Sequence, residues 1–233
     1  MILPKSIICA DAIEWLKSNT CDAVFTSPPD AEEIEKTLED WEIWFRNAIS
    51  LCFKSSLGPV VFYVTDRKSG GRIHSKAGLI FSEAAKCGSI PAWHKICLRR
   101  DVGQIDIHRP TFTHLLAFNG LPGKASSDVI QRGKTVYKNG TGLVAARVGV
   151  EWIKKQAESI TDPFCGQGTI IAVAEALGVR AIGIDIDEMQ CKKARQLYLR
   201  HIDHTVYDVT LESDGTKFDG KGDTFSPLIA NAS

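Results

Sequence analysis

Short apolar stretches rich in β-branched and aromatic residues alternate along this chain with longer stretches whose apolar residues recur at helical spacing. Residues 59–65 (PVVFYVT) have the composition of a central strand, whereas residues 34–53 carry apolar side chains at every third or fourth position. This alternation predicts an α/β fold, with helices on both faces of a parallel or mixed sheet. We expect strands at 6–9, 22–26, 59–65, 93–98, 113–118, 159–162 and 181–184, and helices at 12–16, 34–53, 75–86, 143–154, 169–177 and 188–199. Strands 93–98 and 113–118 are interpreted as an antiparallel pair.

The sequence divides into one long ordered part and a polar end. A length of 233 residues suits a single α/β domain with a full core, which we assign to residues 1–204. Residues 119–139 are rich in Gly, Ser and Lys and predict a loop or a small excursion. Beyond His204 the composition turns to Gly, Asp and Ser, so residues 205–233 are predicted to form a weakly structured tail.

The composition also excludes several classes of protein. No apolar run reaches the roughly 18 residues that span a bilayer, and the N-terminus turns acidic and amphipathic too soon for a secretory signal. The seven cysteines form no CxxC pair and are odd in number, and the six histidines lack metal-ligand spacing. This argues against a disulfide framework and against a metal site. We therefore expect an intracellular protein, away from membranes and without a bound metal.

Charge is balanced over the whole chain but unevenly distributed along it. Lys and Arg together number 28, as do Asp and Glu, and a neutral protein is not an obvious partner for phosphates. Residues 66–100 nevertheless contain eight basic and two acidic side chains, whereas residues 30–46 contain seven acidic and two basic ones. This segregation fits either one basic face suited to a nucleic acid or two ordinary solvated helix surfaces.

The segment Asp162-Pro-Phe-Cys-Gly-Gln-Gly-Thr169 lies between a predicted strand and a predicted helix. Gly166 and Gly168 allow a tight turn and a close approach of the backbone to a ligand, and the following helix presents unpaired N–H groups. Asp185, at the end of the next strand, is suited to accept hydrogen bonds from ribose hydroxyls. Ile171 stands where the dinucleotide fingerprint has its third glycine, which disfavours a nicotinamide oxidoreductase.

The segment Phe25-Thr-Ser-Pro-Pro-Asp30 ends another predicted buried strand. Two prolines make the turn rigid, which fixes the Ser27 side chain and the Pro28 carbonyl in space. Both groups can accept hydrogen bonds from an exocyclic amine, and this would favour the pyramidal amine and direct its lone pair at an incoming methyl group. In isolation the segment is more typical of a proline-bounded loop after a strand.

Together, the two motifs resemble those of the amino-methyltransferase superfamily that modifies adenine N6 or cytosine N4 in DNA. DPFCGQGT resembles its cofactor motif, and TSPPD resembles its (Asp/Asn/Ser)-Pro-Pro-(aromatic) catalytic motif. The catalytic motif comes first, as in the circularly permuted β-type members. The resemblance, over about residues 5–200, implies a Rossmann-like class I methyltransferase fold with a mostly parallel seven-stranded sheet, one strand of which is antiparallel. It also implies S-adenosylmethionine as the cofactor.

The resemblance further implies roles for individual residues. Ser27, Pro28, Pro29 and Asp30 would form the catalytic turn. Asp11 would face the adenine ring of the cofactor and Asp185 its ribose, and the helix beginning near Thr141 would cover the methionine end. The residues predicted to bind the cofactor are Asp11, Thr26, Thr141, Asp162, Phe164, Gly166, Gly168, Thr169 and Asp185.

Asp30 departs from the family pattern, which has an aromatic residue at this position to stack on the flipped base. Three interpretations follow. Another aromatic residue supplies the platform, with Phe62, Tyr63 and Trp93 as candidates; or Asp30 contacts the base as a hydrogen-bond acceptor or a proton acceptor; or the protein has lost catalysis and is an idle binding subunit.

The small size leaves little material to read a nucleotide sequence. Only residues 99–140 are a candidate recognition region, too little to contact many base edges. Either the nucleic acid is selected by its structure, as RNA often is, or a partner subunit or a second copy of the chain supplies recognition. DNA and RNA fit this sequence equally, and a methyltransferase acting on a small amine or a protein amide is the alternative among enzymes.

Overall fold

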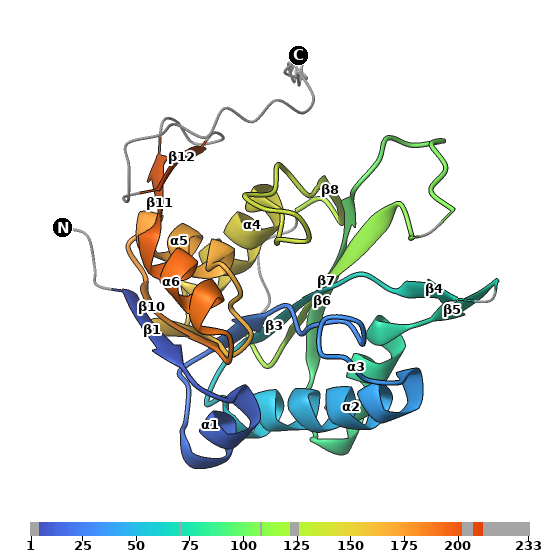
Figure 1. Ribbon diagram of the computed structural model, residues 1–233, viewed down its shortest axis with the longest axis horizontal. Coiled ribbons are helices and arrows are strands. Elements are labelled where there is room, and N and C mark those ends of the chain that lie inside the picture. Colours follow the sequence, from blue (N-terminus) through green and yellow to red (C-terminus); the bar gives the residue numbers. More distant parts are fainter. Residues whose placement is uncertain (1–4, 70, 108, 122–125, 202–206, 212–233) are drawn as a thin grey trace.

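The structure is a computed structural model that describes residues 5–69, 71–107, 109–121, 126–201 and 207–211. Within these residues, eight strands form one sheet in the order β1-β10-β9-β2-β3-β7-β6-β8 (Figure 1). The strands are β1 (Lys5–Cys9), β2 (Val24–Thr26), β3 (Val60–Val64), β6 (Pro91–Leu98), β7 (Phe112–Phe118), β8 (Val129–Gln131), β9 (Ser159–Asp162) and β10 (Arg180–Asp185). Only β7 runs against its neighbours among these described strands.

This sheet confirms the predicted fold class, including the antiparallel pairing of β6 with β7. It has one strand more than the seven that the resemblance implied, because β8 pairs with the outer edge of β6. β8 is only three residues long and lies inside the segment expected to be a loop. Because β8 is so short and two of its three side chains are exposed, it shows no clear apolar alternation. The sequence pattern therefore did not predict a strand here.

Three helices cover each face of the sheet. α1 (Ala12–Ser18), α2 (Leu38–Ser55) and α3 (Lys76–Lys86) lie on one face, and α4 (Leu143–Ile153), α5 (Thr169–Ala176) and α6 (Glu188–Gln196) lie on the other (Figure 1). The side chains of β3 alternate between the two cores that result. Val61 and Tyr63 join the cluster beneath α4 and α5, and Val60, Phe62 and Val64 join the cluster above α2 and α3.

Two helix boundaries differ from those expected. α2 begins at Leu38 rather than at residue 34, because the Thr37 side chain caps it by accepting a hydrogen bond from the Asp40 N–H at 3.2 Å. α6 ends at Gln196 rather than at residue 199, and the chain continues as β11 (Leu197–His201). Leu197 and Leu199 are both buried, and this alternation of period two suits a strand better than a helix.

β11 pairs antiparallel with β12 (Tyr207–Leu211). The prediction of a weakly structured tail over 205–233 is therefore wrong for residues 207–211, where pairing with β11 provides the order that the polar composition did not indicate. Residues 205–206 and 212–233 of that prediction lie outside the described residues. A second hairpin, β4 (Arg67–Ser69) with β5 (Arg72–His74), projects away from the sheet (Figure 1). No helix in the described part of the chain is both long and apolar enough to cross a membrane.

The carboxyl ends of the parallel strands place both sequence motifs at one edge of the sheet. β2 leads into Ser27-Pro28-Pro29-Asp30, and its neighbour β9 leads into the glycine-containing loop. Asp11 and Asp185 follow or end β1 and β10, which are also neighbours. An edge of this kind, outside the carboxyl ends of parallel strands, is where open α/β sheets bind ligands.

Gly149 permits the close packing of α4 on the sheet behind this edge. A Cβ atom at Gly149 would lie 2.4 Å from the ring of Phe25, a side chain that is fully buried on β2. We expect Gly149→Ala to lower the free energy of unfolding by about 1–3 kcal/mol, since the core has no room to relax.

Gly78→Ala is a matched control for this substitution. Gly78 is also helical, but a Cβ atom there would meet only Ser75 at ordinary contact distances from 3.4 Å. We expect this variant to gain up to about 1 kcal/mol from helix propensity. Urea denaturation of both variants checks the pair, and equal stability of the two would contradict the packing argument.

Candidate active site

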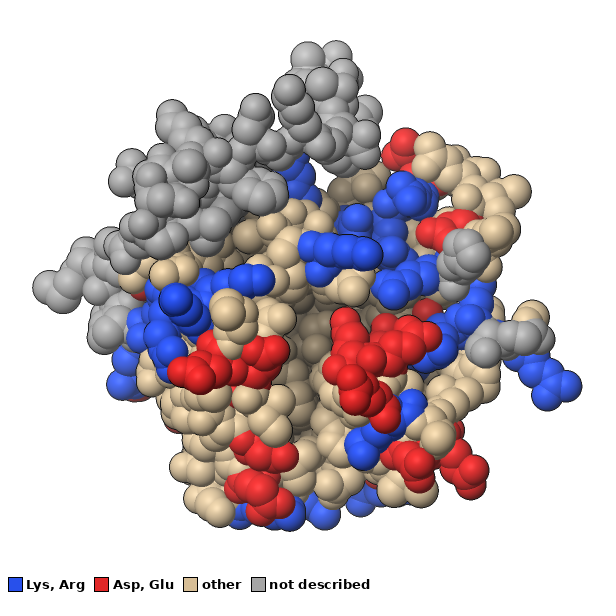
Figure 2. Space-filling view, viewed as in Figure 1, with Lys and Arg blue, Asp and Glu red and all other residues tan. Residues whose placement is uncertain are grey.

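A cleft of about 1030 Å³ opens at the carboxyl edge of the sheet. The space-filling view shows it as a hollow in the middle of this face (Figure 2). Its walls come from both sequence motifs, and its volume is large enough for a ligand bigger than one nucleoside. The predicted site residues that line it are Asp11, Ser27, Pro28, Pro29, Asp30, Thr141, Asp162, Phe164, Gly166, Thr169 and Asp185.

The glycine-containing loop forms one wall of the cleft. Gly166 and Gly168 adopt left-handed backbone conformations, with φ of 52° and 83°, which a residue with a side chain rarely takes. The Gly166 N–H donates to Asp185 Oδ2 at 2.9 Å, and the Cys165 N–H donates to the Ile184 carbonyl at 2.9 Å. The loop is thus fixed against the end of β10 and leads directly into α5.

Asp162 is the most strongly perturbed acid in this wall. Its Oδ1 atom accepts hydrogen bonds from Thr26 Oγ1 at 2.6 Å and from the Phe164 N–H at 3.1 Å. Burial raises the pKa of Asp162 to about 7, and the hydrogen bond from Thr26 opposes this shift. A buried carboxylate at the mouth of a cleft is suited to a ligand that carries a positive charge.

Thr169 and Tyr137 meet at the same wall. The Oγ1 atom of Thr169 is buried near the Tyr137 hydroxyl, and it makes no hydrogen bond of normal geometry with the described residues. The Tyr137 ring covers the loop so closely that a Cβ atom at Gly166 would lie 2.8 Å from its hydroxyl. Burial, with Asp162 nearby, raises the pKa of Tyr137, which keeps the hydroxyl neutral. Thr169 therefore has hydrogen-bonding capacity that a ligand in the cleft can use.

Asp11 and Asp185 stand at the ends of neighbouring strands. Asp11 caps α1 by accepting hydrogen bonds from the N–H groups of Ile13 and Glu14, at 2.7 and 3.1 Å. Burial raises the pKa of Asp185, although the N–H groups of Asp187 and Gly166 oppose the shift by donating to its carboxylate. Both side chains line the cleft and keep acceptor capacity for hydroxyl or amino groups.

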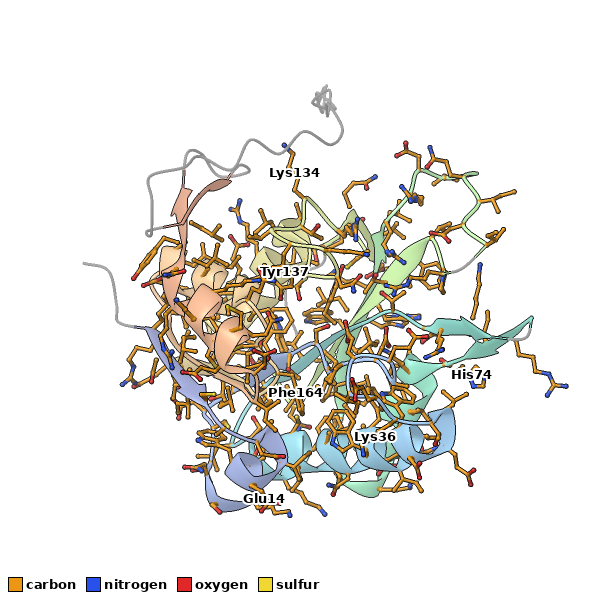
Figure 3. The ribbon with its side chains drawn as sticks, in the orientation of Figure 1. Glu14, Lys36, His74, Lys134, Tyr137 and Phe164 are labelled. Atoms are coloured by element: carbon orange, nitrogen blue, oxygen red, sulfur yellow. The ribbon has the colours of Figure 1, made fainter. Side chains whose placement is uncertain are left out.

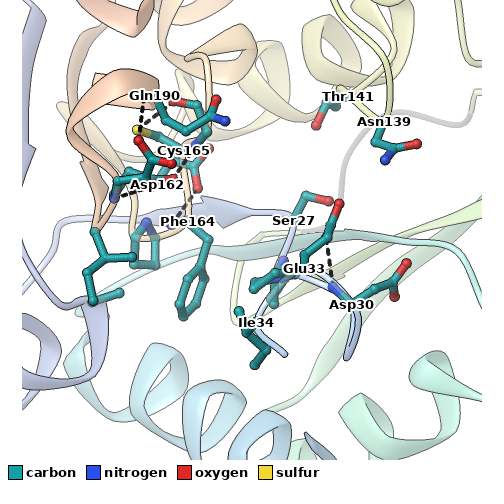
Figure 4. A pocket seen from close by; sticks show the side chains of 18 of the residues that line it. Ser27, Asp30, Glu33, Ile34, Asn139, Thr141, Asp162, Phe164, Cys165 and Gln190 are labelled. Atoms are coloured by element: carbon teal, nitrogen blue, oxygen red, sulfur yellow. Dashed lines mark hydrogen bonds between the residues drawn. The ribbon is translucent and has the colours of Figure 1, made fainter. Parts of the chain in front are cut away.

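The Ser27-Pro28-Pro29 turn forms the opposite wall. Figure 4 shows Ser27, Glu33 and Asp30 on one side of the cleft, and Asp162 and Phe164 on the other. The turn is held from outside by α2, because Trp41 Nε1 donates a hydrogen bond to the Pro29 carbonyl at 3.0 Å. Ser27 makes no hydrogen bond of normal geometry with another described residue, so its hydroxyl is available to a substrate.

Asp30, which replaces the aromatic residue of the family pattern, forms an ion pair with Lys76 at the start of α3. The Lys76 side chain is only 5% exposed, whereas that of Asp30 is 27% exposed. The Lys76 ammonium also lies over the Trp41 ring, 5.6 Å from its centroid. Asp30 is thus the counter-ion of a buried lysine, which disfavours the expectation that it removes a proton from a base.

Three aromatic residues were predicted as substitute platforms, and the structure separates them. Phe62 is fully buried on the α2 and α3 side of β3, so it cannot reach a ligand. Trp93 packs edge-on against Trp152, with ring centroids 5.3 Å apart, and does not line the cleft. Tyr63 does line the cleft, because alternation along β3 turns it to the face opposite Phe62. Tyr63 is the candidate that remains.

Two predicted cofactor residues do not line the cleft themselves. Thr26 is fully buried and supports Asp162 from behind. Gly168 packs against α6, where a Cβ atom would lie 2.9 Å from Ala194. Both positions therefore act through the residues that they hold in place.

The cleft also contains residues that sequence reasoning missed. Tyr137 and Asn139 line it from the loop that follows β8, and Gln190 reaches it from α6 (Figures 3 and 4). Loop residues such as Tyr137 and Asn139 carry no periodicity, and nothing in the spacing of these three residues relates them to either motif. The polar and Gly-rich composition of 119–139 was the only signal, and it indicated a loop without its position.

Comparisons with known proteins agree with this geometry. Residues 142–196 match the family model of DNA methylases known as N6_N4_Mtase. No curated protein gives a significant sequence match. This family match covers α4 and β9 before the glycine-containing loop, the loop itself, and α5, β10 and α6 after it.

Solved structures share the fold. A putative DNA modification methylase from Thermus thermophilus aligns with a TM-score of 0.64 at 18% identity, over 82% of this chain and 92% of that one. The same protein complexed with S-adenosyl-L-methionine gives a TM-score of 0.63 at 18% identity, over 82% and 93%. The cytosine-N4-specific PvuII DNA methyltransferase gives 0.63 at 15% identity, over 87% and 88%.

The ion pair between Asp30 and Lys76 leads to a test of its structural role. Asp30→Asn leaves the Lys76 ammonium buried without a counter-ion, so we expect the free energy of unfolding to fall by about 1–3 kcal/mol, less than for a fully buried pair. The double variant Asp30→Asn/Lys76→Met should recover part of this loss. Glu14→Gln, which breaks an exposed pair with Lys17, is the control and should change stability by at most about 0.5 kcal/mol. Chemical denaturation at neutral pH measures all three, and an Asp30→Asn loss no larger than that of Glu14→Gln would exclude a structural role.

Proposed function

We propose that this chain belongs to the N6/N4 amino-methyltransferase superfamily and transfers methyl groups from S-adenosylmethionine to an amine of a nucleic-acid base, a proposal supported by its fold, its order of motifs and its family-model match. The target is an exocyclic amine of the adenine N6 or cytosine N4 type, or a ring nitrogen beside it. S-adenosylmethionine supplies an activated methyl group, and the protein supplies position and electrostatics.

One observation carries this proposal more than any other. The two motifs face each other across one cleft, and the hydrogen bond from Thr26 to Asp162 joins the strands that lead into them. A methyl donor on the Asp162 side and an amine on the Ser27 side would therefore share one enclosed space. Holding two reactants in this way converts a bimolecular step into an intramolecular one, which accounts for a large part of catalysis in such reactions.

The residues of the glycine-containing loop fit the proposed cofactor. S-adenosylmethionine bears a positive sulfonium and an amino group, and the buried Asp162 carboxylate offers the opposite charge. Asp185 and Asp11 offer acceptors for ribose hydroxyls and for the adenine amine. Thr169 Oγ1, buried without a partner of normal geometry in the described chain, gains one when the cleft is filled.

The Ser27-Pro28-Pro29 turn is proposed to activate the amine. The Ser27 hydroxyl and the Pro28 carbonyl accept hydrogen bonds from the two amine protons, and the lone pair is then directed across the cleft. The stiffness of the two prolines and the hydrogen bond from Trp41 mean that little reorganisation is needed during the reaction. Tyr63 is proposed to contact the face of the base. In the family this is the role of the aromatic residue at the position that Asp30 occupies here.

The substrate is proposed to be DNA in the first instance, with RNA as the comparison. The matched family model describes DNA methylases, and the PvuII enzyme is a DNA methyltransferase. Residues 99–140 stay the candidate recognition region, with residues 1–204 as the catalytic domain. β7 removes residues 112–118 from that region because it lies in the core of the sheet. So small a region favours help from a second copy or a partner subunit, and a nucleic-acid substrate places the protein inside a cell.

Transfer of labelled methyl groups from S-adenosylmethionine tests the proposal directly. We expect incorporation into genomic DNA or total RNA and none into small amines or bulk protein. Binding of S-adenosylhomocysteine without transfer to any nucleic acid would instead support an idle binding subunit.

Ser27→Ala should separate binding from chemistry. Loss of one positioned acceptor is expected to lower the rate of methyl transfer roughly 100-fold, while the Kd for S-adenosylhomocysteine stays unchanged because Ser27 lies on the wall opposite the loop. The exposed Ser18 of α1 provides the control, since Ser18→Ala removes the same hydroxyl away from the cleft. A Ser27→Ala enzyme as active as the Ser18→Ala enzyme would remove Ser27 from the reaction.

Cofactor affinity should depend on pH through Asp162. Because burial raises the pKa of Asp162 to about 7, this acid is largely protonated at pH 6 in the free protein, and a cationic ligand must bind the ionised form. Affinity for S-adenosylmethionine should therefore rise from pH 5.5 to 7.5, by up to about tenfold per unit below pH 7.

Asp162→Asn provides the matching variant, since an amide oxygen can still accept the hydrogen bonds from Thr26 and Phe164. It should bind S-adenosylmethionine weakly and with no pH dependence over this range. A raised carboxyl pKa makes ionisation destabilising above the unfolded pKa, so Asp162→Asn should also raise the Tm of the ligand-free protein at pH 8. Calorimetry and thermal scans check both effects, and an equally steep pH profile in Asp162→Asn would assign the titration to another group.

A further inference from the structure

Three arginines lie near one part of the rim of the cleft, outside both sequence motifs. Arg99 directly follows β6, Arg132 directly follows β8, and Arg109 lies just before β7. β6 is parallel to β8 and antiparallel to β7, so all three positions lie at the same edge of the sheet. This is the edge at which the cleft opens.

The guanidinium groups are partly buried, and no carboxylate of the described residues pairs with them. Arg99 Nη1 donates to the Pro110 carbonyl at 3.1 Å, and Arg109 Nη1 donates to Asn139 Oδ1 at 3.5 Å. Burial and then the positive charges of Arg132 and Arg109 lower the pKa of Arg99, and the opposing effects of Tyr63 and Asp106 are smaller. Like charges held this close are unfavourable unless an anion joins them.

The three arginines lie at the edge of the sheet where the cleft opens, and Arg109 lines the cleft itself. Arg109 and its partner Asn139 line the same cleft as Ser27. The Arg132 carbonyl accepts hydrogen bonds from the N–H groups of Val144 and Ala145, at 3.1 and 3.2 Å, which ties this residue to the first turn of α4. Figure 2 shows a group of basic side chains at the upper right of the central hollow, and acidic side chains on both its left and its right.

We propose that Arg99, Arg109 and Arg132 form a phosphate site that binds the nucleic-acid backbone beside the target nucleotide. Guanidinium groups match phosphate oxygens in geometry and bind them in bidentate fashion. Three cations exceed what one carboxylate of the cofactor would need, which favours a phosphate as the anion. The proposal rests on the function proposed above and adds to it the means by which a chain of zero net charge holds a polyanion.

The test uses the full chain with Arg99, Arg109 and Arg132 all replaced by Gln. Fluorescence anisotropy with a labelled duplex oligonucleotide and with its single strand gives the affinity over a range of salt concentrations. Calorimetry gives the Kd for S-adenosylhomocysteine, and a thermal scan shows that the variant is folded. A second variant with Lys at the three positions keeps the charge but loses the bidentate geometry.

A control with the same change of charge is Lys17→Gln/Lys54→Gln/Arg180→Gln. Lys17 and Lys54 lie in the last turns of α1 and α2, and Arg180 begins β10. These helices return to the amino ends of the strands, so all three residues lie at the edge of the sheet away from the cleft. This control should bind oligonucleotides nearly as well as the unmodified protein.

We expect the Gln variant to bind oligonucleotides at least about tenfold more weakly, with a salt slope smaller by about 1 to 2 for any base sequence. The Lys variant should keep most of the salt slope. The Kd for S-adenosylhomocysteine should not change. Weaker cofactor binding with unchanged oligonucleotide binding would overturn the proposal and assign the arginines to the cofactor carboxylate, and no change in either would overturn it outright.

The result also distinguishes this proposal from the function that it rests on. If the unmodified protein methylates a nucleic acid and the Gln variant does so with the same salt dependence, the phosphate site fails and the function stands. If the unmodified protein binds S-adenosylhomocysteine but no oligonucleotide, both fail.

Discussion

The hydrogen bond from Thr26 to Asp162 is the contact on which the architecture of the cleft depends. It joins residues 136 positions apart in the sequence, at the ends of two neighbouring strands. Thr26 is fully buried, and Asp162 is almost so. In such surroundings an unpaired carboxyl group would be costly, so this bond makes it possible to place an acid at the base of the glycine-containing loop.

The order of the elements along the chain matters less than their order in the sheet. The proline turn lies near the N-terminus and the glycine-containing loop near the C-terminal end of the domain, yet β2 and β9 are neighbours. Parallel strands direct all their carboxyl ends to one edge, and helices on both faces keep that edge open. A circular permutation therefore preserves the site, because the site depends on adjacency within the sheet and not on connectivity.

The two walls of the cleft differ in how the charges of their acidic residues are compensated. On the Asp162 wall, the buried Asp162 and the half-buried Asp185 can offer negative charge to a cation in the cleft. On the Ser27 wall, Asp30 is already neutralised by Lys76 under the Trp41 ring. At the rim, Arg99 is held by a backbone oxygen and Arg109 by an amide oxygen, which orient these side chains but leave their charge uncompensated. Acids in the wall and uncompensated arginines at the rim thus border one opening, which suits a cationic cofactor and an anionic strand at once.

The sequence by itself determined the α/β class, the alternation of elements and the two motifs, because apolar periodicity and glycine or proline spacing are local properties of the chain. It did not reveal β8, β12 or the end of α6, where short strands owe their order to pairing with distant residues. Alternation along β3 places Tyr63 and Phe62 on opposite faces of the sheet. Only the tertiary structure decided which of these faces lines the cleft, and therefore that Tyr63 and not Phe62 reaches it. The same holds for the pairing of Asp30 with Lys76 and for the three arginines. Both the ion pair and the arginine cluster bring together segments that are separated along the chain, and no sequence pattern predicts that these segments meet. Only the packing of the sheet brings them together.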